Sequence, residues 1–232
     1  MTATTFLGLA LIALPIAFNV LFTALARSFG YPDVLREEPA AILARFTAGG
    51  SRLLLTWWAF LLTALALVPL AALVAAELEP AGAAIATLTL ALGVTAGLVQ
   101  ALGLARWPFL VPVLARRHAA ATSEAERVAV TVVFEAAHRY LGVAVGEHLG
   151  YLLTGAWTFV VGLGLIASPV HADWLGIAGL VVGVALMAGS LEFVGIPGDR
   201  GRAWAERLVP IAYIGWSAWL VVLGIALLIG LR

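Results

Sequence analysis

Long apolar runs alternate with short polar connections along the whole chain. Six of these runs are long enough to cross a hydrocarbon layer of about 30 Å as α-helices, each of which needs about 20 residues. We predict transmembrane spans at residues 6–26, 53–76, 83–104, 142–167, 175–194 and 210–231. The pattern therefore predicts an all-α integral membrane protein in which residues 1–232 form a single domain, a six-transmembrane-helix bundle.

Two of the polar connections contain shorter helical patterns. After Pro39, the apolar side chains of Ile42, Leu43 and Phe46 fall on one helix face, and this pattern ends at Gly49. Residues 107–117 contain two prolines and predict a broken, surface-lying elbow. We expect both segments to lie in the membrane interface on the cytoplasmic side as short amphipathic helices.

A longer helical pattern begins at a capping box, Ser123 with Glu126, and continues to about residue 168. At 1.5 Å per residue this helix is too long for one crossing. We therefore expect residues 124–141 to project into solvent or to bend along the membrane surface, and the fourth span to begin near Gly142.

Arginine placement predicts the orientation of the bundle. All thirteen basic residues are arginine, and twelve of them fall in the first, third and fifth connections. Because positively charged loops stay in the cytoplasm, this distribution places both termini outside. A seventh span at residues 128–150 would bury Glu135, Arg139 and Glu147, and it would move the arginines of residues 200–207 outside. We reject the seven-span count for both reasons.

Composition supports the membrane assignment and removes several function classes. The chain is 63% hydrophobic and only 11% charged, with a mean hydropathy of +1.06, whereas a water-soluble domain needs about a quarter charged residues. We therefore expect the lipid bilayer to surround it. The formal net charge is zero, so bulk charge does not attract nucleic acid. Because the chain has no cysteine, disulfides, thiolate nucleophiles and cysteine-ligated metals are excluded.

Four motifs carry a resemblance to known proteins. They are Tyr31-Pro32-Asp33 after the first span, Leu54-Thr56-Trp57-Phe60 in the second, Glu147 through Trp157 (EHLGYLLTGAW) in the fourth and Ile211 through Leu220 (IAYIGWSAWL) in the sixth. With six spans in place, the chain resembles a family of bacterial multi-pass membrane proteins catalogued only as a domain of unknown function. The resemblance covers most of the chain and implies a helical bundle in the bacterial cytoplasmic membrane, without an activity or catalytic residues to carry over.

The few polar side chains inside the predicted spans lie on one side of the membrane. Glu147 and Glu192 fall near the cytoplasmic ends of their spans, and Gln100 and Asn19 lie in the cytoplasmic halves of theirs. An ionised side chain at the bilayer centre costs about 2.5–3.5 kcal/mol or more, so the two carboxylates need an explanation. A cavity that opens to the cytoplasm would hold them.

We hypothesise a shared ligand-binding pocket formed by Glu147, His148 and Glu192, with Glu135 and His138 at its mouth. Gln100 and Asn19 are further candidates for this polar set. The alternatives for these residues remain open. Glu147 and Glu192 could be hydrated at interface depth or paired with Arg139, Arg200 or Arg202; Gln100 could point into a helix contact; and Asn19 could satisfy the carbonyl that Pro15 frees.

Three function classes follow from these residues. We expect a binding or accessory module that holds a lipid, a quinone or another membrane subunit, because no enzyme motif is present. The first alternative is a metal-dependent enzyme in which Glu135-x-x-His138, with Glu147 and Glu192, supplies the ligands. The second is a proton-coupled transporter, since membrane carboxylates suit proton relays. The sequence identifies neither a cofactor nor a ligand.

Overall fold

The computed structural model describes residues 2–196 and 201–231, and these residues form helices and turns without any strand. The all-α prediction is therefore confirmed for the described part of the chain. The elements are α1 (Ala3–Phe29), η1 (Asp33–Arg36), α2 (Pro39–Glu77), η2 (Glu79–Ala81), α3 (Ala83–Phe109), α4 (Val111–Ala120), α5 (Glu124–Ala137), the π-helical segment η3 (His138–Leu149), α6 (Gly150–Ala167), α7 (Asp173–Gly189) and α8 (Ala203–Ile229).

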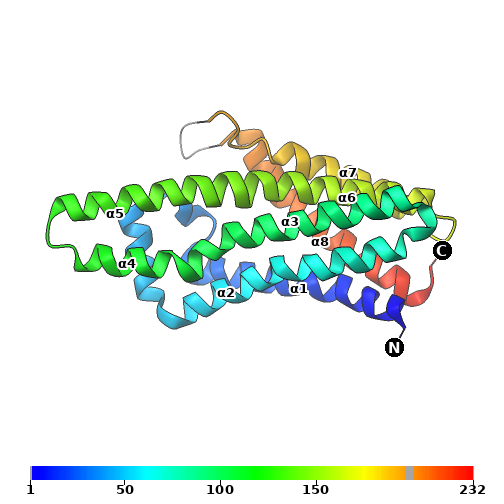
Figure 1. The fold of residues 1–232 in the computed structure, drawn as a ribbon, viewed down its shortest axis with the longest axis horizontal. Coiled ribbons are helices and arrows are strands. Elements are labelled where there is room, and N and C mark those ends of the chain that lie inside the picture. Colours follow the sequence, from blue (N-terminus) through cyan, green and yellow to red (C-terminus); the bar gives the residue numbers. More distant parts are fainter. Residues whose placement is uncertain (1, 197–200, 232) are drawn as a thin grey trace.

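Six long helices form a closed ring. Each helix contacts the next in the order α1, α2, α3, α6, α7, α8, and α8 returns to contact α1. Both termini lie at the same end of the bundle, whereas α4 and α5 lie at the opposite end (Figure 1). Neighbouring helices are therefore antiparallel, as expected when short connections join successive helices.

Five of the helical stretches are long and apolar enough to cross a membrane, and this supports a multi-pass membrane protein. The stretches are Ala3–Phe29, Pro39–Glu77, Ala83–Ala120, Glu124–Ala167 and Ala203–Ile229. The remaining apolar helix, α7, has only 17 residues and ends at Gly189. The helix within the predicted fifth span thus ends earlier than expected, because a series of turns follows α7 and places Glu192 outside the helix.

The segments predicted to lie along the interface are arranged differently. Residues 39–49 continue into α2 across a kink at Gly50, whose φ of 55° suits only glycine. Pro108 and Pro112 do not produce a separate elbow, because α4 follows α3 after the single residue Leu110. Instead, α4 contacts α5, and together they form an antiparallel hairpin that projects beyond the ring (Figure 1).

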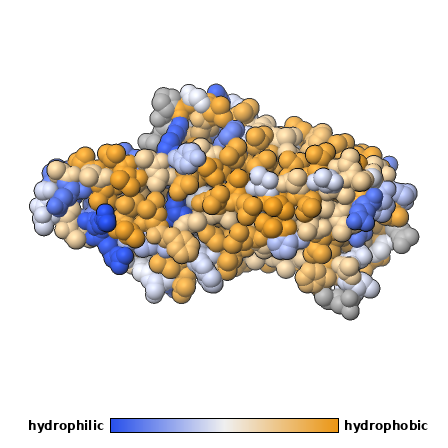
Figure 2. Space-filling view, in the orientation of Figure 1, coloured by the Kyte–Doolittle hydropathy of each residue, from blue (hydrophilic) through white to orange (hydrophobic). Residues whose placement is uncertain are grey.

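The molecule has two packed clusters beneath an apolar outer face. Figure 2 shows hydrophobic side chains along the middle of the bundle and hydrophilic ones gathered toward its ends. The larger cluster lies toward the termini and includes the fully buried Trp157 and Leu220. The second cluster is aromatic and joins α1, α2 and α3, with the rings of Trp57 and Trp107 stacked at a centroid distance of 4.4 Å.

Candidate functional site

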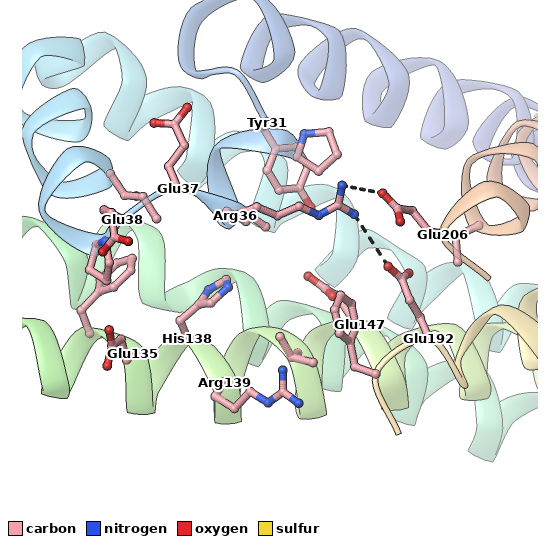
Figure 3. Close-up of a pocket in the computed structure, with 18 of the residues that line it drawn as sticks. Tyr31, Arg36, Glu37, Glu38, Glu135, His138, Arg139, Glu147, Glu192 and Glu206 are labelled. Atoms are coloured by element: carbon pink, nitrogen blue, oxygen red, sulfur yellow. Dashed lines mark ion pairs between the residues drawn. The ribbon is translucent and has the colours of Figure 1, made fainter. Parts of the chain in front are cut away.

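A cavity of about 620 Å³ lies where three segments meet: the connection between α1 and α2, the η3 segment and the turn after α7. Its described lining combines carboxylates, two arginines and phenol groups with apolar side chains (Figure 3). The charged and hydroxyl-bearing members are Arg36, Arg139, Glu37, Glu38, Glu135, Glu147, Glu192, Glu206, Tyr31 and Tyr151. Six carboxylates against two guanidinium groups make this lining predominantly acidic.

The π-helical winding of η3 decides which side chains reach the cavity. At about 100° per residue, an α-helix would place His138 and Glu147, nine positions apart, on opposite faces. A π-helix closes its hydrogen bonds five residues apart, so each turn holds more residues and nine positions come close to two full turns. Both side chains therefore line the same cavity and point toward the connection that carries Tyr31 and Arg36 (Figure 3).

A buried guanidinium group lies beside η3. Arg106, near the end of α3, is only 7% exposed, and its Nη1 donates a hydrogen bond to the Gly103 carbonyl oxygen. A Cβ atom at position 142 would lie 2.7 Å from the Arg106 Nη2 atom, so Gly142 leaves the space that this side chain occupies. Gly142 of η3 thus admits a cation close to the cavity wall.

Arg36 links the two acidic residues on the far side of the cavity. Its Nη1 atom lies 2.6 Å from the Glu206 Oε1 atom, and its Nη2 atom lies 3.8 Å from the Glu192 Oε1 atom (Figure 3). These contacts join the connection after α1 to the turn after α7 and to the first turns of α8. We call this set, Arg36 with Glu192 and Glu206, the Arg36 cluster.

Burial affects the protonation of two groups outside the helices. Burial raises the pKa of the Glu192 carboxyl group. The positive charge of Arg36 opposes this rise, and the negative charge of Glu206 adds to it. Burial, followed by the nearby Glu147 carboxylate, also raises the pKa of the Tyr31 phenol. Tyr31 is therefore a neutral hydrogen-bond donor at physiological pH.

Three carboxylates of the pocket, Glu38, Glu135 and Glu147, have neither a side-chain hydrogen bond nor an ion pair to the described residues. Glu38 and Glu135 are exposed to solvent, whereas Glu147 is partly buried and faces the cavity. Next to it in the lining, His138 stacks on Phe134, and its Nδ1 atom is buried without a described hydrogen-bond partner. Two polar groups are thus left for water or a guest molecule to satisfy.

Residues 6–224 match a protein family described as a domain of unknown function, DUF4386. The chain belongs to the DUF4386 family. No curated protein and no solved structure matches the chain.

The DUF4386 chain brings four of the seven predicted site residues into the lining of one cavity. Glu135, His138 and Glu147 lie on the continuous helix that runs from α5 into η3, and Glu192 comes from the turn after α7; all four meet there. His148 is not in this lining. Its Nδ1 atom is 2.8 Å from the Ser190 carbonyl oxygen, and its ring faces an adjoining groove.

The other two predicted residues make helix–helix contacts away from the cavity. The Gln100 amide donates a hydrogen bond of 2.9 Å to the Thr154 hydroxyl of α6. The Asn19 amide donates to the Pro15 carbonyl oxygen and to the Ser217 hydroxyl of α8. Each of these contacts satisfies a polar group inside an apolar bundle, which is the alternative considered for both residues.

The arginines considered as partners for the carboxylates have other described contacts. Arg139 donates to the Ile196 carbonyl oxygen, and Arg202 donates to the Leu191 carbonyl oxygen. Arg200 lies outside the described residues. The described ion-pair partner of Glu192 is Arg36, one of the arginines of the first connection.

The described residues contain no group of three or more His, Asp or Glu side chains that could hold a metal ion. Glu135 and His138 share a cavity, but the alternative of a metal-dependent enzyme has no support from their geometry. A binding role, in which these side chains hold a guest molecule through hydrogen bonds and charge, uses the same residues.

Several residues of the site have no counterpart among the sequence predictions. They are Arg36, Glu206, Arg106, Tyr31 and Tyr151. Tyr31 and Tyr151 belong to the motifs that carried the family resemblance, so this signal was available. The buried position of Arg106 depends on α3 extending past the predicted end of its span, and Arg36 and Glu206 meet only through the tertiary fold.

Proposed function

We propose that this protein is an amphiphile-binding module of the bacterial cytoplasmic membrane, with six crossings and both termini outside. The closed ring of six helices and the location of both termini at one end support an even number of crossings. The short α7 is extended by apolar, exposed side chains in the turn that follows it, including Leu191 and Val194. Such residues accommodate a helix shorter than the hydrocarbon layer.

The cavity then lies at the boundary between the apolar bundle and the arginine-bearing end. A helix of 20 residues spans about 30 Å, so a crossing that ends at Ala167 begins close to Glu147. The first, third and fifth connections, which carry the arginines, meet around the cavity. The positive-inside rule therefore favours an opening toward the cytoplasm.

The single observation that carries the proposal is the Glu147 carboxylate, which faces a cavity of about 620 Å³ without a partner among the described residues. Leaving a carboxylate unsatisfied at this depth is costly, and a bound molecule that donates hydrogen bonds would remove that cost. The acidic lining favours a donor or cationic headgroup. It disfavours a quinone, whose carbonyl groups only accept hydrogen bonds.

The test is mass spectrometry of the small molecules that copurify with the protein in a mild detergent. We expect an amphiphile at near-stoichiometric amounts with the unmodified chain and at a reduced amount with Glu147→Gln. Glu124→Gln is the matched control, because Glu124 has the same side chain and lies exposed on the projecting hairpin. The control should retain the amphiphile.

Two outcomes would contradict the proposal. One is the absence of any copurifying amphiphile from the unmodified protein, even after gentle extraction. The other is equal retention by Glu147→Gln and by Glu124→Gln, since the carboxylate in the cavity would then have no part in binding.

A further inference from the structure

A second hollow of about 420 Å³ adjoins the cavity on the outer side of η3. We call it the lateral groove. It is lined by Ala136, Arg139, Tyr140, Val143, Ala144, His148, Phe193 and Val194. Four of these residues, Ala136, Arg139, Val143 and Phe193, also line the cavity, so the two spaces share a wall.

The described linings of the groove and the cavity differ in their carboxylates. The described lining of the groove contains the Arg139 guanidinium and the His148 imidazole and no carboxylate, whereas the cavity is rich in glutamate. The contact between His148 Nδ1 and the Ser190 carbonyl oxygen requires a proton on Nδ1, so the other ring nitrogen, Nε2, takes no part in this contact. Arginine, with its fork of N–H donors, is a usual partner of a phosphate group.

Adjacent residues of η3 line the two spaces. Glu147 faces the cavity and His148, the next residue, faces the groove. A ligand that reached both would carry a cationic group for Glu147 and an anionic group for the groove. The outer rim of the groove is apolar and exposed at Ala144 and Val194, and the exposed ring of Tyr140 lies beside them.

We propose that the ligand is an aminophospholipid that enters sideways from the cytoplasmic leaflet. Its ammonium group lies in the cavity against Glu147, its phosphate lies in the lateral groove beside Arg139 and His148, and its acyl chains leave along the exposed rim into the bilayer. Lipid phosphate is favoured over free phosphate because the groove is mostly apolar and its rim exposes apolar side chains. This inference rests on the proposed function and specifies its ligand class.

The experiment is native mass spectrometry of the full-length protein in detergent, titrated with lipids of identical acyl chains. Phosphatidylethanolamine supplies both charges, phosphatidylglycerol supplies only the phosphate, and inorganic phosphate supplies the anion without a lipid. We expect phosphatidylethanolamine to bind about tenfold more tightly than phosphatidylglycerol, the size expected of one charge-assisted hydrogen bond. Inorganic phosphate should not compete at millimolar concentration.

Three variants assign the two headgroup charges. Glu147→Gln should remove the preference for phosphatidylethanolamine and leave phosphatidylglycerol binding unchanged. His148→Gln should weaken both lipids equally, because it acts on the shared phosphate. Arg116→Gln, at an exposed arginine of α4, is the control for a general loss of positive charge and should change neither lipid.

Equal affinity of the unmodified protein for the two lipids would overturn the inference, as would an unchanged preference in Glu147→Gln.

Because His148 has a structural contact with Ser190, the thermal unfolding of each variant is measured in the same detergent. If an amphiphile without an amine or a phosphate copurifies and depends on Glu147, the proposed function stands and this inference fails. If no amphiphile depends on Glu147, both fail.

Discussion

The two halves of this bundle differ in the polar groups that they hold. In the half nearer the termini, the buried polar groups are neutral hydroxyl and indole groups, and the hydrogen bonds that they make run to backbone carbonyl groups of the bundle. The Trp219 indole donates to the Leu175 carbonyl oxygen and the Thr158 hydroxyl donates to the Thr154 carbonyl oxygen, whereas the Trp157 and Trp216 indoles are buried without a described partner. In the half beneath the α4–α5 hairpin, glutamates and arginines surround a cavity. The comparison shows that the apolar half holds the ring together, whereas the charged half leaves room for water or a guest.

The largest effect is expected in the apolar half, where α6 and α7 approach closely. A Cβ atom at Gly155 would lie 2.6 Å from the Gly183 carbonyl oxygen, so Gly155→Ala forces the helices apart. We expect a loss of about 1–3 kcal/mol in the free energy of unfolding, measured by denaturant titration in detergent. Gly215→Ala is the control, because its nearest neighbour would be at 3.7 Å. It should be neutral or stabilising by up to about 1 kcal/mol.

The Arg36 cluster should give the next largest effect. Arg36→Gln leaves Glu192 and Glu206 without their shared cation, and we expect a loss of about 1–2 kcal/mol in the same titration. The value is modest because Arg36 is one-third exposed to solvent. Adding Glu192→Gln to Arg36→Gln should restore part of the loss. Arg127→Gln is the comparison, because it breaks an ion pair with Glu124 on the surface. If Arg127→Gln lowers the free energy of unfolding as much as Arg36→Gln does, Arg36 has no special role.

Stability should also depend on pH through Glu192. Its pKa in the folded state is raised, chiefly by burial, so the folded protein holds this proton more tightly than the unfolded chain does. The stabilisation is fully present below the ordinary carboxyl pKa of about 4.3 and is lost as the pH rises through the folded-state pKa. Across this pH range, the free energy of unfolding should therefore decline less for Glu192→Gln than for the unmodified protein. An identical decline in both proteins would contradict the assignment.

The smallest effect concerns the polar contact between α3 and α6. Gln100→Leu removes the hydrogen bond to the Thr154 hydroxyl, and contacts of this kind between membrane helices are worth about 0.6 kcal/mol on average. Denaturant titration should show a loss of this size. The double variant with Thr154→Val should be no less stable than Gln100→Leu alone, because neither polar group is then left unsatisfied.

Much of the fold was predictable because apolar runs and turn residues are local features of the chain. The helices, their order and the length of the element from Glu124 to Ala167 follow from such patterns. The end of α7 was not predictable from such patterns, because Leu191, Phe193 and Val194 are as apolar as a helix interior although the backbone turns there. The joining of the Pro39 helix to α2 depends on the backbone of Gly50, which hydropathy does not report.

The site was predictable in part for a related reason. Glu147 and Glu192 stand out as charges near the ends of apolar runs, which hydropathy detects directly. His138 was predicted at the mouth of the pocket, but α-helical geometry does not explain its place beside Glu147, because an α-helical projection puts the two on opposite faces. The π-helical winding of η3 brings them to one side. The contact of Arg36 with Glu206 joins residues far apart in the sequence, so only the folded ring reveals it.

The most direct test of the account compares one buried position in each half of the bundle. The chain has no cysteine, so Val143→Cys in the cavity wall and Val161→Cys in the apolar core each carry a single thiol. Both positions are at least nine-tenths buried, and the two substitutions are chemically identical. The measurement is the labelling rate with a water-soluble maleimide in inverted and in right-side-out membrane vesicles. We predict that Val143→Cys reacts in inverted vesicles and that Val161→Cys reacts in neither. A Val143→Cys thiol that reacts in neither orientation, or only from the outside, would contradict the central claim.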